Sequence, residues 1–363
     1  MKELPMKDLN SSSPPRRLAT AHLFQTAQMV ESKASAVVTL RGLGATRQLR
    51  IGTELGGWDD RRWRRLAAQQ FNYGTLETYW SADSTQRGVY NFQRQDRQVN
   101  WARRAQIQLY GHALVYPQFR LIPDWLRRGR FTREQYIEIL QQHITTVMTH
   151  FKGKIHEWVV VNEALETGEH PRDFFQRKIG PDYVEIAFAT ARAVDPTATL
   201  IYNDYNNETT SGANTENTQQ IVKRLKALGL IDAVGLQMHL GGSTRYRKAD
   251  LVQTMRAYEL PVHITELDVD LRSVAGSQTQ RFRKQARLYR RVLEAALEAG
   301  VTTINVWGLS DRYSWLELPS ERNASPLSDP CLYDENLQPK PAYQAWIEVL
   351  QGVSASPKRT LHS

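Results

Sequence analysis

The chain repeats one pattern eight times: a short run of apolar and β-branched residues is followed by a longer stretch with helical periodicity. Strands that alternate with helices in this way favour parallel pairing. Eight such units within about 300 residues are typical of a closed (β/α)8 barrel, the TIM barrel of the α/β class. The candidate strands are residues 49–55, 71–77, 107–115, 155–162, 199–205, 231–237, 261–269 and 302–309.

The main alternative is an open, doubly wound sheet, which normally carries a Gly-rich phosphate loop after its first strand. No such loop follows residues 49–55, and the chain contains no GxxxxGK[ST], HExxH or paired CxxC motif. Nucleotide-binding and zinc-dependent functions therefore lack support in the sequence.

The net charge of +9 suggests a nucleic-acid partner, which requires basic residues gathered on one face with interleaved aromatic residues. The arginines instead lie between apolar residues that recur at helical spacing, as in residues 281–300. The apolar positions there are Phe282, Ala286, Tyr289, Leu293, Ala296 and Leu297. The basic residues between them then occupy the solvated face of a helix, so we expect no nucleic-acid partner.

The two ends of the chain lack this pattern. Residues 1–48 are expected to form an N-terminal extension, partly disordered, with a short hairpin within residues 34–50. The barrel is expected over residues 49–350, and residues 351–363 as a flexible tail. No segment has the apolar core of a signal peptide or the length to span a bilayer. We expect a monomer without a membrane partner. Its location is unknown, cytoplasmic by default and secreted if the N-terminus is incomplete.

Polar and aromatic residues follow the predicted strands where each strand ends. In barrels of this kind the chemistry lies at the carboxyl ends of the strands. The third to eighth strands end in or near His112, Asn162, Glu163, Asn203, Asp204, Tyr205, Asn206, Gln237, His239, Glu266, Asp268, Trp307 and Trp315. Carboxylates, amides, imidazoles and indoles are therefore expected to converge at one end of the barrel.

Each of these residues alone has a structural explanation. Asn162 could cap a following helix, and Glu163 could lie in its first turn. A single histidine or tryptophan is more often part of a core than of a binding site. The stronger signal is the pair of glutamates, Glu163 and Glu266, on opposite strands of one ring, surrounded by amides and flat aromatic faces. Two carboxyl groups that face each other are what acid-assisted cleavage of a glycosidic bond requires.

The motifs at these strand ends resemble those of glycoside hydrolase family 10, best known for endo-1,4-β-xylanases. The resemblance covers roughly residues 50–348 and keeps the family's order. It includes "GHALV", "WVVVNEA", "IGPDYVEIAFATARAVDP", "YNDYN", "GLQMHL", "ITELDV", "WGLSDRYSWL" and "LYDENLQPKPAY". The strongest signals are "VVNEA" and "ITELD", which contain the two glutamates.

The resemblance implies a retaining double displacement with Glu163 as general acid/base and Glu266 as nucleophile, their carboxyls about 5–5.5 Å apart. It implies that His239 donates to an ionised Glu266 and that Asp268 holds the imidazole from its other side. The pKa of Glu163 should be raised by the negative charge of Glu266. The substrate-binding residues would be His112, Asn162, Tyr205, Gln237, His239, Trp307 and Trp315. The resemblance also implies that the protein needs no cofactor and no metal ion.

The chain departs from the family pattern beside the catalytic subsite. Leu76 and Tyr79 stand where family members usually have asparagine and lysine, and Tyr116 and Pro117 where they have tryptophan and histidine. Loss of groups that pair sugar hydroxyls should change the preferred sugar or the affinity for long chains.

Three functions stay open at this point. The first is a retaining endo-acting β-glycosidase that hydrolyses β-1,4-xylan or xylo-oligosaccharides. The second is the same mechanism on a different β-linked glycan or glycoside. The third is a carbohydrate-binding protein without turnover, although a pure binder has no need of both Glu163 and Glu266.

Overall fold

The computed structural model describes residues 38–164, 173–317 and 327–352. Within these ranges the strands are β1 (Arg50–Glu54), β2 (Tyr73–Glu77), β3 (Gln108–His112), β4 (Glu157–Asn162), β5 (Thr199–Asp204), β6 (Ala233–Leu236), β7 (His239–Gly241), β8 (Val262–Asp270) and β9 (Thr303–Val306). They pair in parallel in the order β6-β5-β4-β3-β2-β1-β9-β8, and β6 pairs with β8 to close the ring. The short β7 pairs with the far end of β8. The predicted (β/α)8 barrel is confirmed.

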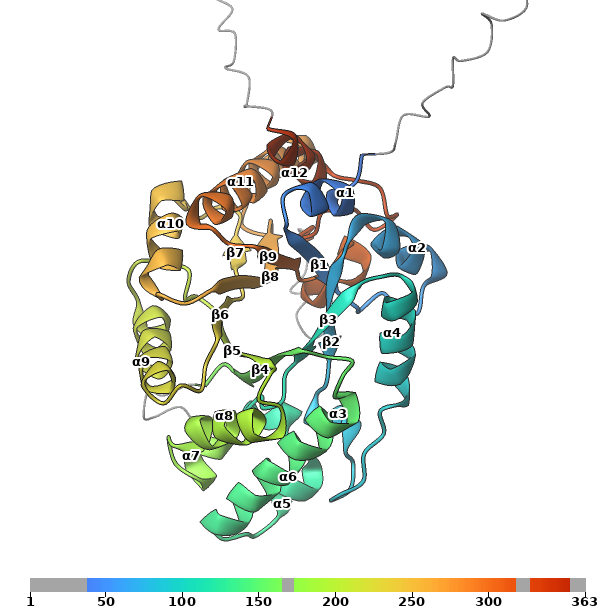
Figure 1. Ribbon diagram of the computed structural model, residues 1–363. Helices are drawn as coiled ribbons and strands as arrows, with labels where there is room; N and C mark the ends of the chain where they lie inside the picture. The colour runs from blue at the N-terminus through green and yellow to red at the C-terminus, as the bar shows by residue number, and fades with distance from the viewer. Residues whose placement is uncertain (1–37, 165–172, 318–326, 353–363) are drawn as a thin grey trace, which may run out of the picture. The chain divides into compact units, whose positions relative to one another are not determined.

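Helices surround this ring of strands (Figure 1). Those described are α1 (Leu40–Thr46), α2 (Arg61–Gln70), α3 (Trp80–Asp83), α4 (Gln93–Arg104), α5 (Asp124–Arg128), α6 (Arg133–Phe151), α7 (Phe174–Lys178), α8 (Tyr183–Val194), α9 (Ala213–Ala227), α10 (Lys248–Ala257), α11 (Gln278–Ala299) and α12 (Pro341–Gln351), with 3₁₀ turns η1 (Phe119–Leu121), η2 (Asp311–Tyr313) and η3 (Trp315–Glu317). None of the helices in the described ranges combines the length and apolar character needed to cross a bilayer.

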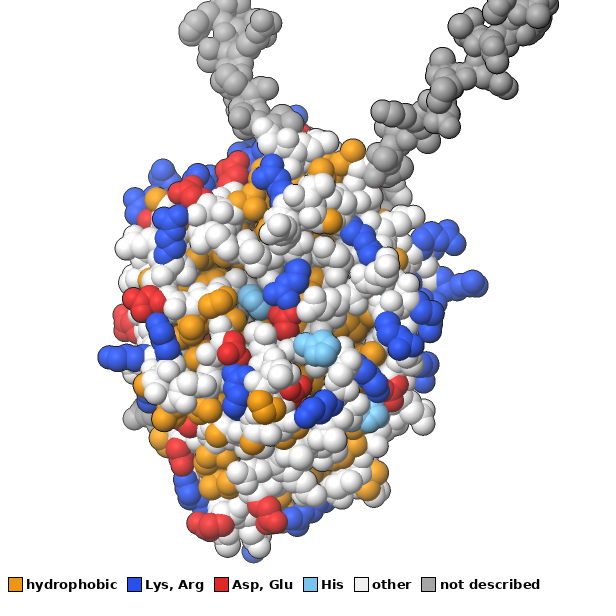
Figure 2. Space-filling model, viewed as in Figure 1, with side chains coloured by type: hydrophobic (Ala, Val, Ile, Leu, Met, Phe, Trp, Pro, Cys, Tyr) orange, Lys and Arg blue, Asp and Glu red, His pale blue; other side chains and the backbone are white. Residues whose placement is uncertain are grey.

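The longest helices are amphipathic and have well-defined ends. Helix α11 begins with a capping box between Ser277 and Gln280 and ends at Gly300, whose φ of 84° few other residues adopt readily. Its apolar stripe, including Tyr289 and Leu293, is buried against the barrel. Basic side chains occupy the outer faces of the helices, and Figure 2 shows Lys and Arg along the edge that carries α2. The prediction that basic residues lie on a solvated face is confirmed for Arg283, Lys284 and Arg287 of α11, which are exposed. Arg281 and Arg290 of the same helix are mostly buried and form ion pairs with Asp329 and Glu348.

The hairpin predicted before the barrel is wrong, because residues 40–46 form helix α1. Thr39 caps this helix by accepting a hydrogen bond from the Gly42 amide, and Leu40 is completely buried. The Arg41 guanidinium donates to the carbonyl oxygens of Ala68 and Ala105, each at 2.9 Å, near the ends of α2 and α4. These tertiary contacts override the weak helix propensity of a Gly-rich segment.

The predicted domain boundaries at residues 48 and 350 stay a prediction. The partly disordered segment proposed within residues 1–48 falls largely on residues 1–37, which lie outside the described residues. The flexible tail proposed for residues 351–363 falls mainly on residues 353–363, which also lie outside them.

The barrel is closed by side chains at the amino ends of its strands. Arg50 forms an ion pair with the buried Glu157, and that carboxylate also accepts hydrogen bonds from Tyr73 at 3.2 Å and Gln108 at 2.6 Å. Above this layer the stacked rings of Tyr73 and Tyr110 fill the interior, with centroids 5.3 Å apart. The opposite end, where the strands terminate in polar residues, is left open.

Candidate active site

A cavity of about 610 Å³ lies at the carboxyl ends of the strands. Its lining includes all nine residues predicted to be catalytic or substrate-binding: His112, Asn162, Glu163, Tyr205, Gln237, His239, Glu266, Trp307 and Trp315. The supporting residue Asp268 lies behind the wall of the cavity, with its Oδ2 3.0 Å from Nδ1 of His239. The fold therefore brings the whole predicted set to one place.

Glu163 follows β4 directly and has an unusual backbone conformation. Its φ of 55° lies in the left-handed region, which costs a residue other than glycine about 1–3 kcal/mol. Its amide donates to the carbonyl of Asn203 at 2.9 Å, so contacts with β5 help to hold the strained turn. Four donors reach its carboxyl group: Tyr116 Oη at 2.6 Å, Gln237 Nε2 at 2.9 Å and Asn162 Nδ2 at 3.2 Å bind Oε1, and Gln118 Nε2 at 2.7 Å binds Oε2.

The pKa of the Glu163 carboxyl is raised above its ordinary value, chiefly because the group is buried. The hydrogen bonds from Tyr116 and Gln237 oppose this shift, and the negative charge of Glu266 adds to it. The predicted direction is confirmed, but burial contributes more than the neighbouring charge that we expected to be the cause. A raised pKa favours the protonated form of the carboxyl, which is the form that a proton donor needs.

Glu266 lies within β8 and has the opposite electrostatic environment. Its burial alone would raise the pKa, but the imidazoles of His112 and His239 and the amide of Asn203 hold the pKa below its ordinary value. Asn203 Nδ2 donates to Oε1 at 2.7 Å, whereas His239 Nε2 lies 3.3 Å from Oε2. Both the predicted donor, His239, and the shorter contact from Asn203 therefore support an ionised carboxylate.

A chain of three amide side chains connects the two glutamates. Asn203 Nδ2 also donates to Asn162 Oδ1 at 2.7 Å, and Gln237 Nε2 lies 3.3 Å from the same oxygen. Asn162 therefore acts as the centre of this chain. The alternative that it merely caps a helix is not what the structure shows, because no helix begins among the residues described directly after β4.

Gly235 on β6 makes room for this arrangement. A Cβ atom at Gly235 would lie only 2.1 Å from Oδ1 of Asn203, so any larger residue would displace that amide. Thr265 Oγ1 donates to the same Oδ1 at 2.6 Å, which fixes the orientation of the amide and points its Nδ2 at Glu266.

His239 is held between two carboxylates. Its burial would lower the pKa, but Asp268 and then Glu266 raise it well above its ordinary value, so the imidazole carries a proton and a charge near neutral pH. Trp315 Nε1 donates to Asp268 Oδ2 at 2.8 Å, so this indole is fixed through the same carboxylate. The ring of Trp307 packs edge-on against His112, with centroids 5.2 Å apart.

The four departures from the family pattern have different structural roles. Leu76 is completely buried in the core and does not line the cavity. Pro117 is also buried, and its carbonyl accepts a hydrogen bond from the Phe174 amide at 3.0 Å. Tyr79 and Tyr116 line the cavity. The hydroxyl of Tyr79 donates to Glu77 at 3.0 Å, whereas that of Tyr116 donates to Glu163.

Several residues that line this cavity are not among those predicted from the sequence. Glu77, Gln118, Arg120 and Leu121 line the cavity, and Asn206, noted only as a strand-end residue, lines it too. Glu77 ends the predicted strand 71–77, so the strand-end criterion could have found it. Glu54, the last residue of β1, has a pKa raised to about 8 by its burial and by the charge of Glu77. No comparable signal marks Gln118, which lies in a connecting segment.

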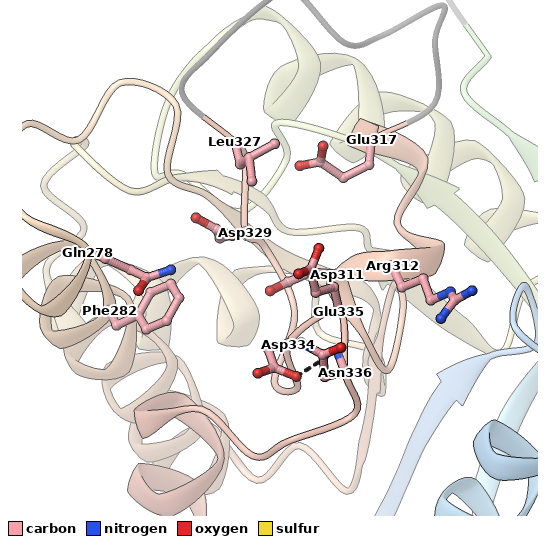
Figure 3. A pocket seen from close by; sticks show the side chains of 10 residues that line it. All are labelled: Gln278, Phe282, Asp311, Arg312, Glu317, Leu327, Asp329, Asp334, Glu335 and Asn336. Atoms are coloured by element: carbon pink, nitrogen blue, oxygen red, sulfur yellow. Dashed lines mark hydrogen bonds between the residues drawn. The ribbon is translucent and has the colours of Figure 1, made fainter.

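A second cavity of about 540 Å³ lies beside α11, and Figure 3 shows its lining of acidic side chains. Two of its carboxylates are paired with cations: Lys340 Nζ lies 2.9 Å from Asp311 Oδ2, and Arg281 lies 3.3 Å from Asp329 Oδ2. None of the residues predicted from the sequence lines it. Among the described residues, no group of three or more His, Cys, Asp or Glu side chains could hold a metal ion.

Two glutamates in one cavity, one with a raised and one with a lowered pKa, surrounded by amides and indoles at the mouth of a barrel, are the arrangement of a glycoside hydrolase. The chain belongs to glycosyl hydrolase family 10, whose model matches residues 44–349. It is 33% identical to endo-1,4-beta-xylanase B of Thermotoga neapolitana over 338 residues, 89% of this chain and 94% of that protein.

Solved structures of xylanases are also similar to this chain. The native xylanase 10B from Thermotoga maritima matches with a TM-score of 0.79 and 32% identity, covering 87% of this chain and 98% of that one. Xylanase 10B from Thermotoga petrophila RKU-1 in complex with xylobiose matches with a TM-score of 0.79 and 31% identity over the same shares.

Proposed function

We propose that the protein is a retaining, endo-acting β-glycosidase that hydrolyses β-1,4-xylan or xylo-oligosaccharides. Glu163 is the general acid/base and Glu266 the nucleophile. The observation that carries this assignment is the opposite shift of their two pKa values within one cavity. The names of the relatives, endo-1,4-beta-xylanases, and the xylobiose complex of a similar structure support the choice of substrate.

In the first step the Glu266 carboxylate attacks the anomeric carbon, and the bond from that carbon to the glycosidic oxygen breaks. Glu163 gives its proton to this oxygen, so the aglycone leaves as an alcohol. The product is an ester between the sugar and Glu266. Because the negative charge of Glu266 is now neutralised, one cause of the raised pKa of Glu163 disappears, and the carboxylate can act as a base.

In the second step Glu163 takes a proton from water, and the water oxygen attacks the anomeric carbon. The ester bond breaks, Glu266 is released as a carboxylate, and two inversions give net retention. The sugar binds in the cavity at the carboxyl ends of the strands. The residues that contact it there are His112, Asn162, Tyr205, Gln237, His239, Trp307 and Trp315. Indoles contact the apolar faces of sugar rings, while amides and imidazoles pair with hydroxyls.

The proposal extends to the organisation of the chain. The catalytic barrel is assigned to residues 49–350, between an N-terminal extension and a C-terminal tail that both fall mainly outside the described residues. It acts as a monomer without a nucleic-acid or membrane partner, and requires no cofactor.

The test compares wild type with Glu266→Ala and Glu163→Ala on xylan, xylo-oligosaccharides and aryl β-xylosides. We expect wild type to release short oligosaccharides from within the chain, with the β-anomer formed first in an NMR time course. Glu266→Ala should be inactive, and azide should restore activity to Glu163→Ala on aryl glycosides. Wild type no faster than both variants on every substrate would refute the proposal, as would xylan binding without release of reducing ends.

The wall formed by Glu77 and Tyr79 favours a second candidate function, the same mechanism on a different β-linked glycan or glycoside. The phenol of Tyr79 presents other hydrogen-bonding groups to a sugar than an ammonium does, and the buried Leu76 supplies no amide. A panel of β-linked oligosaccharides and aryl glycosides decides between the two, and a clear preference for xylo-oligosaccharides would exclude this alternative.

A further inference from the structure

The two oxygens of the Glu163 carboxyl differ in their hydrogen bonds. Oε1 accepts from three donors, Tyr116 Oη at 2.6 Å, Gln237 Nε2 at 2.9 Å and Asn162 Nδ2 at 3.2 Å. Oε2 accepts from one, Gln118 Nε2 at 2.7 Å. Two of these donors, Tyr116 and Gln118, come from one short segment after β3 that leads into η1.

Backbone contacts fix this segment in place, so its side chains can hold the Glu163 carboxyl in one orientation. Gln118 forms a β-bridge with Asp173, and the Pro117 carbonyl accepts a hydrogen bond from the Phe174 amide at 3.0 Å. The Gln118 amide also donates to Tyr116 Oη at 3.1 Å, which leaves the phenolic hydrogen directed at Glu163. The bridge to Asp173 therefore couples the start of α7 to the position of the acid.

We propose that Tyr116 and Gln118 are positioning residues that orient the Glu163 carboxyl and leave Oε2 as the oxygen that carries the transferable proton. This inference rests on the proposed role of Glu163 as general acid/base. It adds which oxygen donates and which residues determine that choice.

The chemical reason lies in the unequal number of donors. Donors stabilise an oxygen that carries negative charge or acts as a carbonyl, and they oppose a proton on that oxygen. A proton on Oε1 would weaken the hydrogen bonds from three donors, whereas a proton on Oε2 would weaken the hydrogen bond from only one. The proton therefore resides on Oε2, and Gln118 limits the directions in which this oxygen can move.

A pH test needs every charged or titratable group near Glu163 to stay constant. Glu266 on β8 and Asp204 on β5 interact with its charge. The other such groups of the cavity are Glu77, Tyr79, Arg120, Tyr205, His112 and His239. Substitution of Tyr116 by phenylalanine or of Gln118 by leucine changes none of these groups and adds no charge.

The experiment measures kcat/KM against pH for Tyr116→Phe and Gln118→Leu, with aryl β-glycosides of xylobiose whose leaving groups differ in pKa. Loss of a donor to the carboxylate raises the pKa of Glu163, so the alkaline limb of the profile should move up by about one pH unit. With a poor leaving group, which needs the proton, kcat/KM should fall about tenfold. With a 2,4-dinitrophenyl leaving group, which does not need it, the value should stay within about twofold of wild type.

The matched control is Tyr79→Phe, which removes a phenolic hydroxyl from the same cavity. This hydroxyl donates to Glu77 and not to Glu163. The substitution can change KM, but the alkaline limb and the dependence on leaving group should match those of wild type. Circular dichroism and thermal melting establish that each variant is folded, and if one is not, the other decides.

The inference is overturned if folded Tyr116→Phe and Gln118→Leu keep both the wild-type alkaline limb and the wild-type dependence on leaving group. An equal loss with all leaving groups would also overturn it, because a merely structural role predicts that pattern. Glu163→Ala separates this failure from that of the proposed function. If Glu163→Ala is itself insensitive to the leaving group, the acid/base assignment is wrong.

Discussion

The substitution Asn203→Ala tests how Glu266, the proposed nucleophile, is kept ionised. Asn203 is completely buried, and its Nδ2 donates to Glu266 Oε1 at 2.7 Å. A hydrogen bond to a charged group contributes about 1.5–3 kcal/mol. Because one pKa unit corresponds to about 1.36 kcal/mol, its loss should raise the pKa of Glu266 by about one to two units.

The direction of the resulting pH effect follows from the mechanism. In the proposed mechanism Glu266 must be ionised to attack, so the acid limb of kcat/KM should move up by about one to two pH units in Asn203→Ala. The folded pKa of Glu266 is depressed, so the ionised group stabilises the fold above its unfolded pKa. This stability is lost as the pH falls through the folded pKa. The variant should therefore show a smaller loss of melting temperature between neutral and acidic pH than wild type does.

The assay is kcat/KM against pH on an aryl xylobioside, together with thermal melting over the same range. The matched control is Asn207→Ala, which removes another buried amide from the same part of the chain. Asn207 Nδ2 donates to the Gly235 carbonyl at 3.1 Å and to neither glutamate, so the acid limb should stay in place. An unchanged acid limb in folded Asn203→Ala would refute the reasoning, because the ionisation of Glu266 would then not depend on this donor.

Further predictions concern the support of the site and of the barrel. Gly235→Ala should displace the Asn203 amide and lower kcat at least tenfold with little change in KM. A variant with the kcat of wild type would show that the amide can move without affecting catalysis. Asp268→Asn removes the main group that raises the pKa of His239, so this pKa, followed by NMR of the ring protons, should fall. An unchanged titration would mean that another group holds the charge. Arg50→Met leaves a buried carboxylate unpaired at the amino end of the barrel and should lower the free energy of unfolding by roughly 2 kcal/mol in urea titrations, with kcat unchanged. A stability equal to that of wild type would contradict this role.

The sequence alone was sufficient for the fold, and the nine residues predicted from it to be catalytic or substrate-binding line one cavity. Short runs of apolar and β-branched residues that alternate with helical patterns favour parallel pairing, and eight such units are typical of a closed barrel. Once the strands are assigned, the polar residues directly after them, such as Glu163 and Glu266, must lie at one end. Glu77 obeys the same rule and could have been predicted, although the comparison with the family pattern drew attention to its neighbours Leu76 and Tyr79.

Other features depended on contacts between segments far apart in the chain. Helix α1 forms because Leu40 is buried and Arg41 reaches carbonyl groups near the ends of α2 and α4, which no local pattern shows. The donors to Glu163 from Tyr116 and Gln118 depend on a bridge to Asp173, across more than fifty residues. The sequence determined which residues stand at the ends of the strands, because side-chain direction along a strand follows from local periodicity. Only the tertiary structure decided which oxygen of Glu163 each donor binds, because hydrogen bonds between loops depend on distances that local periodicity does not define.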